Sequence, residues 1–135
     1  AIHSSLEDHS LVFMLNRYLK TGFKRKRKDL LLTDSISFPI YEWDDTIHDR
    51  YWTCMGNSCE LEESFDVNDL FGSEVGISKY HLIPEYRDAD YFLKIEQDGT
   101  FVEDEIVKQV SSIPQVITAY SINRKELRSI ENIIY

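Results

Sequence analysis

Two cysteines and two of the histidines are the residues of this chain whose types could form a reactive or metal-binding site. Cys54 and Cys59 are separated by four residues, and His48 and His81 lie on either side of them. Thiolates and imidazoles are the usual ligands of Zn²⁺, and a cysteine beside a histidine can act as a nucleophile. A second close Cys/His pair is missing from the sequence, however, and both histidines are isolated. We therefore expect two free thiols, no metal and no cofactor.

Carboxylates are far more abundant than thiols. The pairs Asp44-Asp45 and Glu62-Glu63 belong to a total of 24 Asp and Glu, against 15 Lys and Arg. General acid–base catalysis needs a particular carboxylate in a perturbed environment, which abundance alone does not indicate. The five glycines are scattered and form no phosphate-binding loop. The sequence therefore favours a solvated acidic surface and a protein that is not an enzyme; a small enzyme using these groups is an alternative.

The acidic excess is concentrated in one segment. Residues 42–74 carry ten acids against Arg50 alone, so their net charge of −9 equals that of the whole chain. Such a surface repels nucleic acid and attracts a basic protein. The acids in this segment that we expect to bind a protein partner are Glu42, Asp44, Asp45, Asp49, Glu60, Glu62, Glu63, Asp66 and Asp69.

Four aromatic residues, Tyr41, Trp43, Tyr51 and Trp52, adjoin these acids. Neighbouring residues of a strand point to opposite faces, so at least one ring of the pair Tyr51 and Trp52 is expected at the surface. Aromatic rings dominate the binding energy of many protein interfaces. We expect the four rings to bind the same partner as the acids, and burial of the rings in the core is the alternative.

The basic segment 24–28, KRKRK, contrasts with the rest of the chain. Five adjacent cations could bind phosphate in a salt-dependent way. Phe23 is the one aromatic residue beside them, and the residues from Asp29 onward hold 22 acids and 8 bases, a net of −14. We therefore do not expect a nucleic acid partner, and a nucleic-acid-associated accessory protein is the second interpretation.

The elements that position these groups follow from patterns of apolar residues. Ser4-x-x-Glu7 predicts a capping box at the start of a helix that ends near Gly22. Residues 34–43 and 50–55 alternate or are rich in aromatic residues, which predicts strands. Gly56-Asn57 then predicts a turn.

That turn would return the chain as the second strand of a hairpin. Residues 59–65 would be this strand and would pair with residues 50–55. The thiols of Cys54 and Cys59 would then face each other across the hairpin.

The C-terminal part shows the clearest periodicity. Residues 91–95 predict a strand, and Val102, Ile106, Val110 and Ile113 then lie on one face of a helix that ends at Pro114. Residues 116–122 are rich in β-branched side chains and predict another strand. The sequence therefore predicts one α+β domain over residues 1–135. It has a mixed or antiparallel sheet with packed helices and a right-handed C-terminal β-α-β unit.

Membrane and export signals are not visible in the sequence. No stretch approaches the roughly 20 apolar residues that cross a bilayer. The N-terminal residues AIHSSLEDHS lack a basic region followed by a long apolar run, so we do not interpret them as a signal peptide. With two cysteines as well, the chain is expected to be cytoplasmic and without a membrane partner.

The acidic, aromatic segments EWDDTIHDRYW and ELEESFDVNDLFGSE give the chain a resemblance to a functional class. In size and in this character it resembles the immunity proteins of bacterial toxin systems, of the colicin type and of contact-dependent growth inhibition. The resemblance implies a protein that neutralises one cognate toxin, often a basic nuclease, by covering its active or substrate-binding surface. The basic segment 24–28 departs from a uniformly acidic protein.

Overall fold

A computed structural model describes residues 1–65, 74–99 and 103–134. Within these ranges, six strands form an antiparallel sheet in the order β10-β1-β9-β6-β5-β2. In that order the strands are Val116–Ala119, Ile2–Ser4, Tyr91–Gln97, Arg50–Gly56, Ile40–Asp45 and Lys24–Arg25. Two α-helices pack against this antiparallel sheet, so the chain has a small α+β fold.

Two smaller ribbons and a few short helices complete the described chain. β3 (Leu30–Leu31) pairs with β4 (Ser37–Phe38), and β7 (Ser58–Phe65) pairs with β8 (Glu74–His81). The α-helices are α1 (Asp8–Tyr18) and α2 (Glu103–Ser111). Three 3₁₀ turns are Pro84–Tyr86, Arg124–Glu126 and Ile130–Ile133. Neither α-helix, nor any other helix in the described ranges, is long and apolar enough to cross a membrane.

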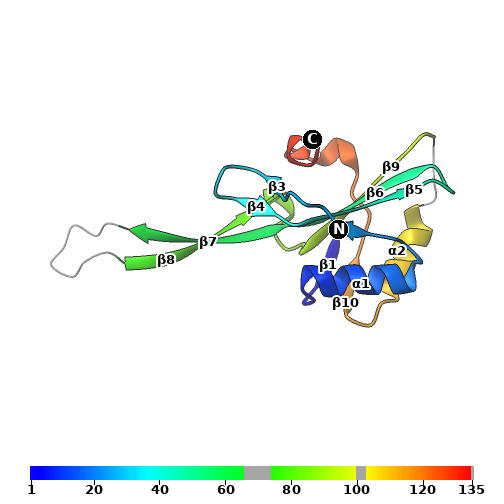
Figure 1. Cartoon of the computed structure of the whole chain (residues 1–135), viewed down its shortest axis with the longest axis horizontal. Coiled ribbons are helices and arrows are strands. Elements are labelled where there is room, and N and C mark those ends of the chain that lie inside the picture. Colours follow the sequence, from blue (N-terminus) through cyan, green and yellow to red (C-terminus); the bar gives the residue numbers. More distant parts are fainter. Residues whose placement is uncertain (66–73, 100–102, 135) are drawn as a thin grey trace.

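The central sheet is covered on both faces because its strands alternate two sets of apolar residues. Trp43, Trp52 and Ile95 are cross-strand neighbours on the face that packs against the two α-helices. The second core cluster forms on the opposite face of the sheet, around Met55 and Phe92. Figure 1 shows α1 and α2 on one side of the sheet and the C-terminal turns on the other.

The first helix is present, but its predicted ends are wrong. Glu7 occupies the N-cap without a capping hydrogen bond. The Ser4 hydroxyl instead donates to the Gln115 carbonyl at 2.8 Å, since Ser4 belongs to strand β1. The helix ends at Tyr18, and Lys20 adopts the left-handed conformation (φ 59°). Gly22 does not end the helix but leaves room for the Trp43 ring, because a Cβ at this position would lie 3.0 Å from the indole nitrogen.

The C-terminal predictions agree with the structure at the level of single elements. β9, α2 and β10 appear in the predicted order, although Thr100 and Val102 lie outside the described residues. Val110 and Ile113 are buried, as expected for the inner face of α2. β1 lies between β9 and β10 and is antiparallel to both, so these two strands are not hydrogen-bonded neighbours.

The predicted hairpin at Gly56-Asn57 is wrong, because β6 continues into β7 and β7 pairs with β8. Asn57 is fully buried, and its side-chain amide donates to the carbonyls of Tyr86 (3.0 Å) and Ala89 (2.8 Å). Its side-chain oxygen accepts from the Ile83 amide at 2.8 Å. Asn57 thus ties the junction of β6 and β7 to the segment after β8 instead of forming a turn.

Candidate protein-binding surface

The β7–β8 ribbon extends away from the sheet along the longest axis of the molecule (Figure 1). Its eight residue pairs run from Ser58↔His81 to Phe65↔Glu74. No third strand pairs with either edge of this ribbon in the described ranges. An isolated two-stranded ribbon is marginally stable in water, and its open edges can pair with another chain. We call residues 58–81 the arm.

The arm is acidic and carries an exposed apolar side chain. In sequence it holds six carboxylates against one cation, Lys79. Glu60 and Glu62 are exposed and lie on the same face of the ribbon as Ile77, which is 69% exposed and directly opposite Glu62. Glu63 belongs to β7, whereas the expected partner-binding residues Asp66 and Asp69 lie outside the described residues. Ile77 is not among the residues that the sequence predicted to bind a partner. What identifies it is the pairing of an aliphatic residue with an acid, Glu62, on the neighbouring strand.

The other acidic group lies at the opposite end of the molecule. The end of β5 and the turn that leads to β6, which we call the 44–49 turn, carry the exposed residues Asp44 and Asp49, and Asp49 has a left-handed backbone (φ 53°). Asp45 is only 3% exposed, accepts a hydrogen bond from the His48 amide at 3.2 Å and lies 2.9 Å from the His48 ring nitrogen. Asp45 therefore closes this turn and is not a surface contact, which corrects its assignment to a binding surface.

The four aromatic residues are mainly part of the core. Tyr41 and Trp52 are 8% and 4% exposed, so their expected role as surface contacts is wrong. The rings of Trp43 and Trp52 are 5.8 Å apart, and Phe23 packs against both. The helices cover this face of the sheet and bury the large apolar rings. Burying these rings stabilises the fold more than leaving them exposed to water would. Trp43 and Tyr51 remain half-buried.

Glu42 is also committed within the protein. It is half-buried, accepts a hydrogen bond from the Tyr51 hydroxyl and lies 3.6 Å from the Lys26 ammonium. A partner would have to replace these interactions to use Glu42. The expected acids whose described side chains are exposed are therefore Glu60 and Glu62 of the arm and Asp44 and Asp49 at the other end.

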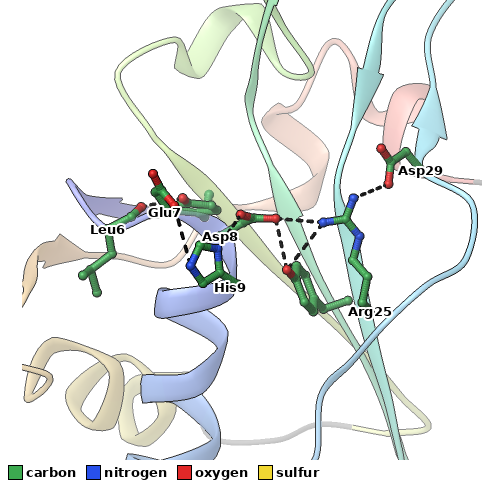
Figure 2. A network of polar contacts seen from close by, with 8 residues as sticks. Leu6, Glu7, Asp8, His9, Arg25 and Asp29 are labelled. Carbon is green, nitrogen blue, oxygen red and sulfur yellow. Dashed lines mark hydrogen bonds and ion pairs between the residues drawn. The ribbon is translucent and has the colours of Figure 1, made fainter.

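The basic segment 24–28 is partly built into the fold (Figure 2). Arg25 lies 2.9 Å from Asp8 and 2.6 Å from Asp29, and its guanidinium stacks 5.4 Å from the centre of the Tyr41 ring. The Tyr41 hydroxyl donates to the same Asp8 carboxylate at 3.0 Å. These contacts join β2, β5 and the start of α1, so this segment is not wholly peripheral to the fold.

This arrangement reduces the cations that face solvent. Arg25 and Lys26 have acidic neighbours, which leaves Lys24, Arg27 and Lys28 as the exposed cations of the segment that form no ion pair with a described residue. Nucleic acid binding depends on the number of phosphates that cations neutralise. Lys24 lies on the edge strand β2, and Arg27 and Lys28 lie in the bend that follows it, so the three cations give a small footprint for phosphates.

The thiols are set apart from each other. Cys54 is buried on the helix-covered face of β6, whereas Cys59 lies on β7, and neither forms a disulfide. Burial raises the pKa of the Cys54 thiol to about 12, the opposite of what a nucleophilic cysteine requires. No group of three or more His, Cys, Asp and Glu side chains in the described ranges is arranged to hold a metal ion. The predicted hairpin contact between the two thiols is therefore wrong.

Comparisons with protein-family models, with curated proteins and with solved structures find no match for this chain.

Proposed function

We propose that this chain binds a basic protein through its acidic arm and that it is an immunity protein, which neutralises a cognate bacterial toxin in the cytoplasm. The observation that carries the proposal is the protruding ribbon, with exposed Glu60 and Glu62 around an exposed Ile77. A monomeric fold gains little from such an extension, because residues 61–62 and 76–78 belong to neither core cluster. The arm acts by binding, without catalysis.

The shape of the arm suits entry into a cleft. Eight residue pairs at about 3.3 Å per residue give a ribbon roughly 25 Å long. A basic nuclease binds its anionic substrate in a cleft lined with cations, and carboxylates on a narrow ribbon would compete for the same cations. Ile77 would then supply the apolar contact that slows dissociation. Binding of the arm would block the substrate site.

The two acidic ends of the molecule are too far apart to form one ordinary interface. From Arg50 to Phe65, β6 and β7 extend about 50 Å at the usual rise per residue. A standard interface buries about 800 Å² on each partner. A compact patch of that area is narrower than the distance between the two acidic ends. We therefore assign partner binding to the arm and not to the 44–49 turn.

The test is capture of the partner with and without the arm. In the shortened variant, Asn-Gly replaces residues 61–78 between Glu60 and Lys79, because this dipeptide favours a two-residue hairpin turn. The unaltered protein should retain a basic protein from the native host and inhibit that protein's activity. The shortened variant should do neither, although its melting temperature should stay within a few degrees, since the removed residues whose side chains are described, 61–62 and 76–78, lie outside both cores.

Two results would contradict the proposal. One is equal capture and inhibition by the folded, shortened variant. The other is that the captured protein is acidic or keeps its full activity when bound.

A further inference from the structure

The outward face of α1 has a large aromatic ring at its centre. Phe13 is 63% exposed, although it lies midway along the helix. His9, Phe13 and Arg17 are all exposed and follow one another at intervals of four residues, so they form one ridge along the solvent side of α1. The buried residues of the helix lie on its other side, against the sheet. The Phe13 ring therefore contributes little to the core of a single chain.

An open pocket of about 370 Å³ lies beside the Phe13 ring. It is lined by Leu6, His9, Ser10, Phe13 and Met14, and by Gln115, the residue before β10. Ser10 and Met14 belong to the next ridge of the helix, so the pocket is part of the groove between two ridges. Helices pack by placing the ridges of one helix into the grooves of another. The face thus carries both a protruding ring and a groove that can receive one.

The charges on this face differ between the two ends of the helix. At the N-terminal end, the exposed Glu7 carboxylate lies 3.6 Å from the His9 ring (Figure 2). At the C-terminal end, Arg17 and Lys20 are exposed, and neither forms an ion pair with a described residue. Because an acid marks one end and cations mark the other, the face is complementary to an antiparallel copy of itself.

A two-fold axis that passes close to Phe13 produces such a pair. His9 and Arg17 are each four residues from Phe13, so antiparallel packing places residue 9 of one copy opposite residue 17 of the other. Arg17 then meets the Glu7 carboxylate beside His9, and the contact occurs twice because a two-fold interface repeats each contact. Each Phe13 ring enters the groove of the other helix. A chain with a net charge of −9 repels its own copies in most orientations, whereas this face pairs opposite charges.

We propose that the outward face of α1 is the interface of a symmetric dimer of this chain. One helix face and one pocket are smaller than the standard interface of about 800 Å² on each partner. We therefore expect a weak dimer, with a dissociation constant on the order of 10–100 µM. α1 and the arm are separate elements (Figure 1), so the dimer does not depend on the proposed function.

The test is analytical ultracentrifugation of the unaltered protein over a range of about 5–500 µM, in which it should change from monomer to dimer. Phe13→Ala should weaken dimerisation about tenfold or more, because each copy loses the ring that enters the groove. Leu31→Ala is the matched control: Leu31 is also 63% exposed but lies on β3, and its replacement should leave dimerisation unchanged. Circular dichroism should show that every variant is folded.

Charge reversal tests the antiparallel orientation. Arg17→Glu alone and Glu7→Arg alone should each weaken dimerisation about tenfold, because either variant brings like charges together at both ends of its dimer. An equimolar mixture of these two variants should dimerise as well as the unaltered protein, since the mixed dimer pairs opposite charges at both ends. The variant with the shortened arm should dimerise normally, so failure here is separate from failure of the proposed function.

Three results would overturn the inference. One is a protein that stays monomeric at about 500 µM, which would leave this face to a partner other than a second copy. Another is a folded Phe13→Ala variant that dimerises as well as the unaltered protein. The third is a mixture of the two charge-reversed variants that dimerises no better than either variant alone.

Discussion

At the scale of single residues, Asn57 makes five hydrogen bonds within the protein. It is fully buried, and three side-chain hydrogen bonds join it to Ile83, Tyr86 and Ala89. Its backbone makes two more, with Asp90 and Leu82. The dipeptide Gly56-Asn57 predicts a turn at this position, because glycine is common in turns and an Asn side chain commonly bonds to its own backbone. Here its partners lie 26 to 32 residues away in sequence, and a local pattern carries no information about them.

Replacing Asn57 should therefore be costly. Asn57→Ala removes the partner of the buried Ala89 carbonyl and of the buried Ile83 amide, and also the bond to the Tyr86 carbonyl, so the free energy of unfolding should fall by about 3 kcal/mol or more. Urea denaturation measures this loss. The control is Asn123→Ala, which removes a cap of an exposed 3₁₀ turn and should cost about 1 kcal/mol or less. Equal losses in the two variants would show that the Asn57 network does not stabilise the fold.

The two thiols should differ in reactivity. Cys54 is 2% exposed, and burial raises its pKa to about 12, so almost none of it is thiolate near pH 8. Cys59 is half-buried on the arm. A thiol reagent at pH 8 should modify Cys59 in the folded protein and Cys54 only after unfolding in guanidinium, as mass spectrometry of the modified peptides would show. Equal rates for both thiols in the folded protein would contradict the placement of Cys54 in the core.

At the scale of elements, predictability depends on whether an element is specified locally. The helix α2 and strand β9 follow from strong periodic patterns and are confirmed. The ends of α1 are not, because Ser4 pairs within the sheet and Gly22 accommodates the Trp43 ring. The burial of Tyr41 and Trp52 depends on which face of the sheet the helices cover, and strand alternation alone leaves that open.

The arm should depend on its exposed aliphatic residue for affinity. Ile77→Ala should weaken binding to the captured partner by about 2 kcal/mol, because a buried apolar contact at an interface contributes that order of free energy. Ile47→Ala is the matched control: Ile47 is 88% exposed in the 44–49 turn, and its replacement should change affinity little. Equal affinity of the two variants would remove Ile77 from the interface.

At the scale of the whole molecule, acidic residues that are close together in the sequence lie at two opposite ends of the structure. One continuous segment, residues 42–74, carries the acidic excess, but β6 and β7 extend it along the longest axis (Figure 1). Asp45 and Glu42 have internal partners, so the acids are not equivalent. The composition therefore predicts a basic partner, whereas only the strand pairing shows which acids could meet it together.

The central claim is that the arm, and not the other acidic end, binds a basic protein. The most direct measurement compares two double variants that each remove two negative charges, Glu60→Gln with Glu62→Gln on the arm and Asp44→Asn with Asp49→Asn on the turn. Association and dissociation rates with the captured partner are measured at low and high salt for both. The arm variant should associate about fivefold or more slowly at low salt, with a smaller salt dependence, because these carboxylates steer the encounter. The turn variant should match the unaltered protein, and equal or greater slowing in the turn variant would contradict the account.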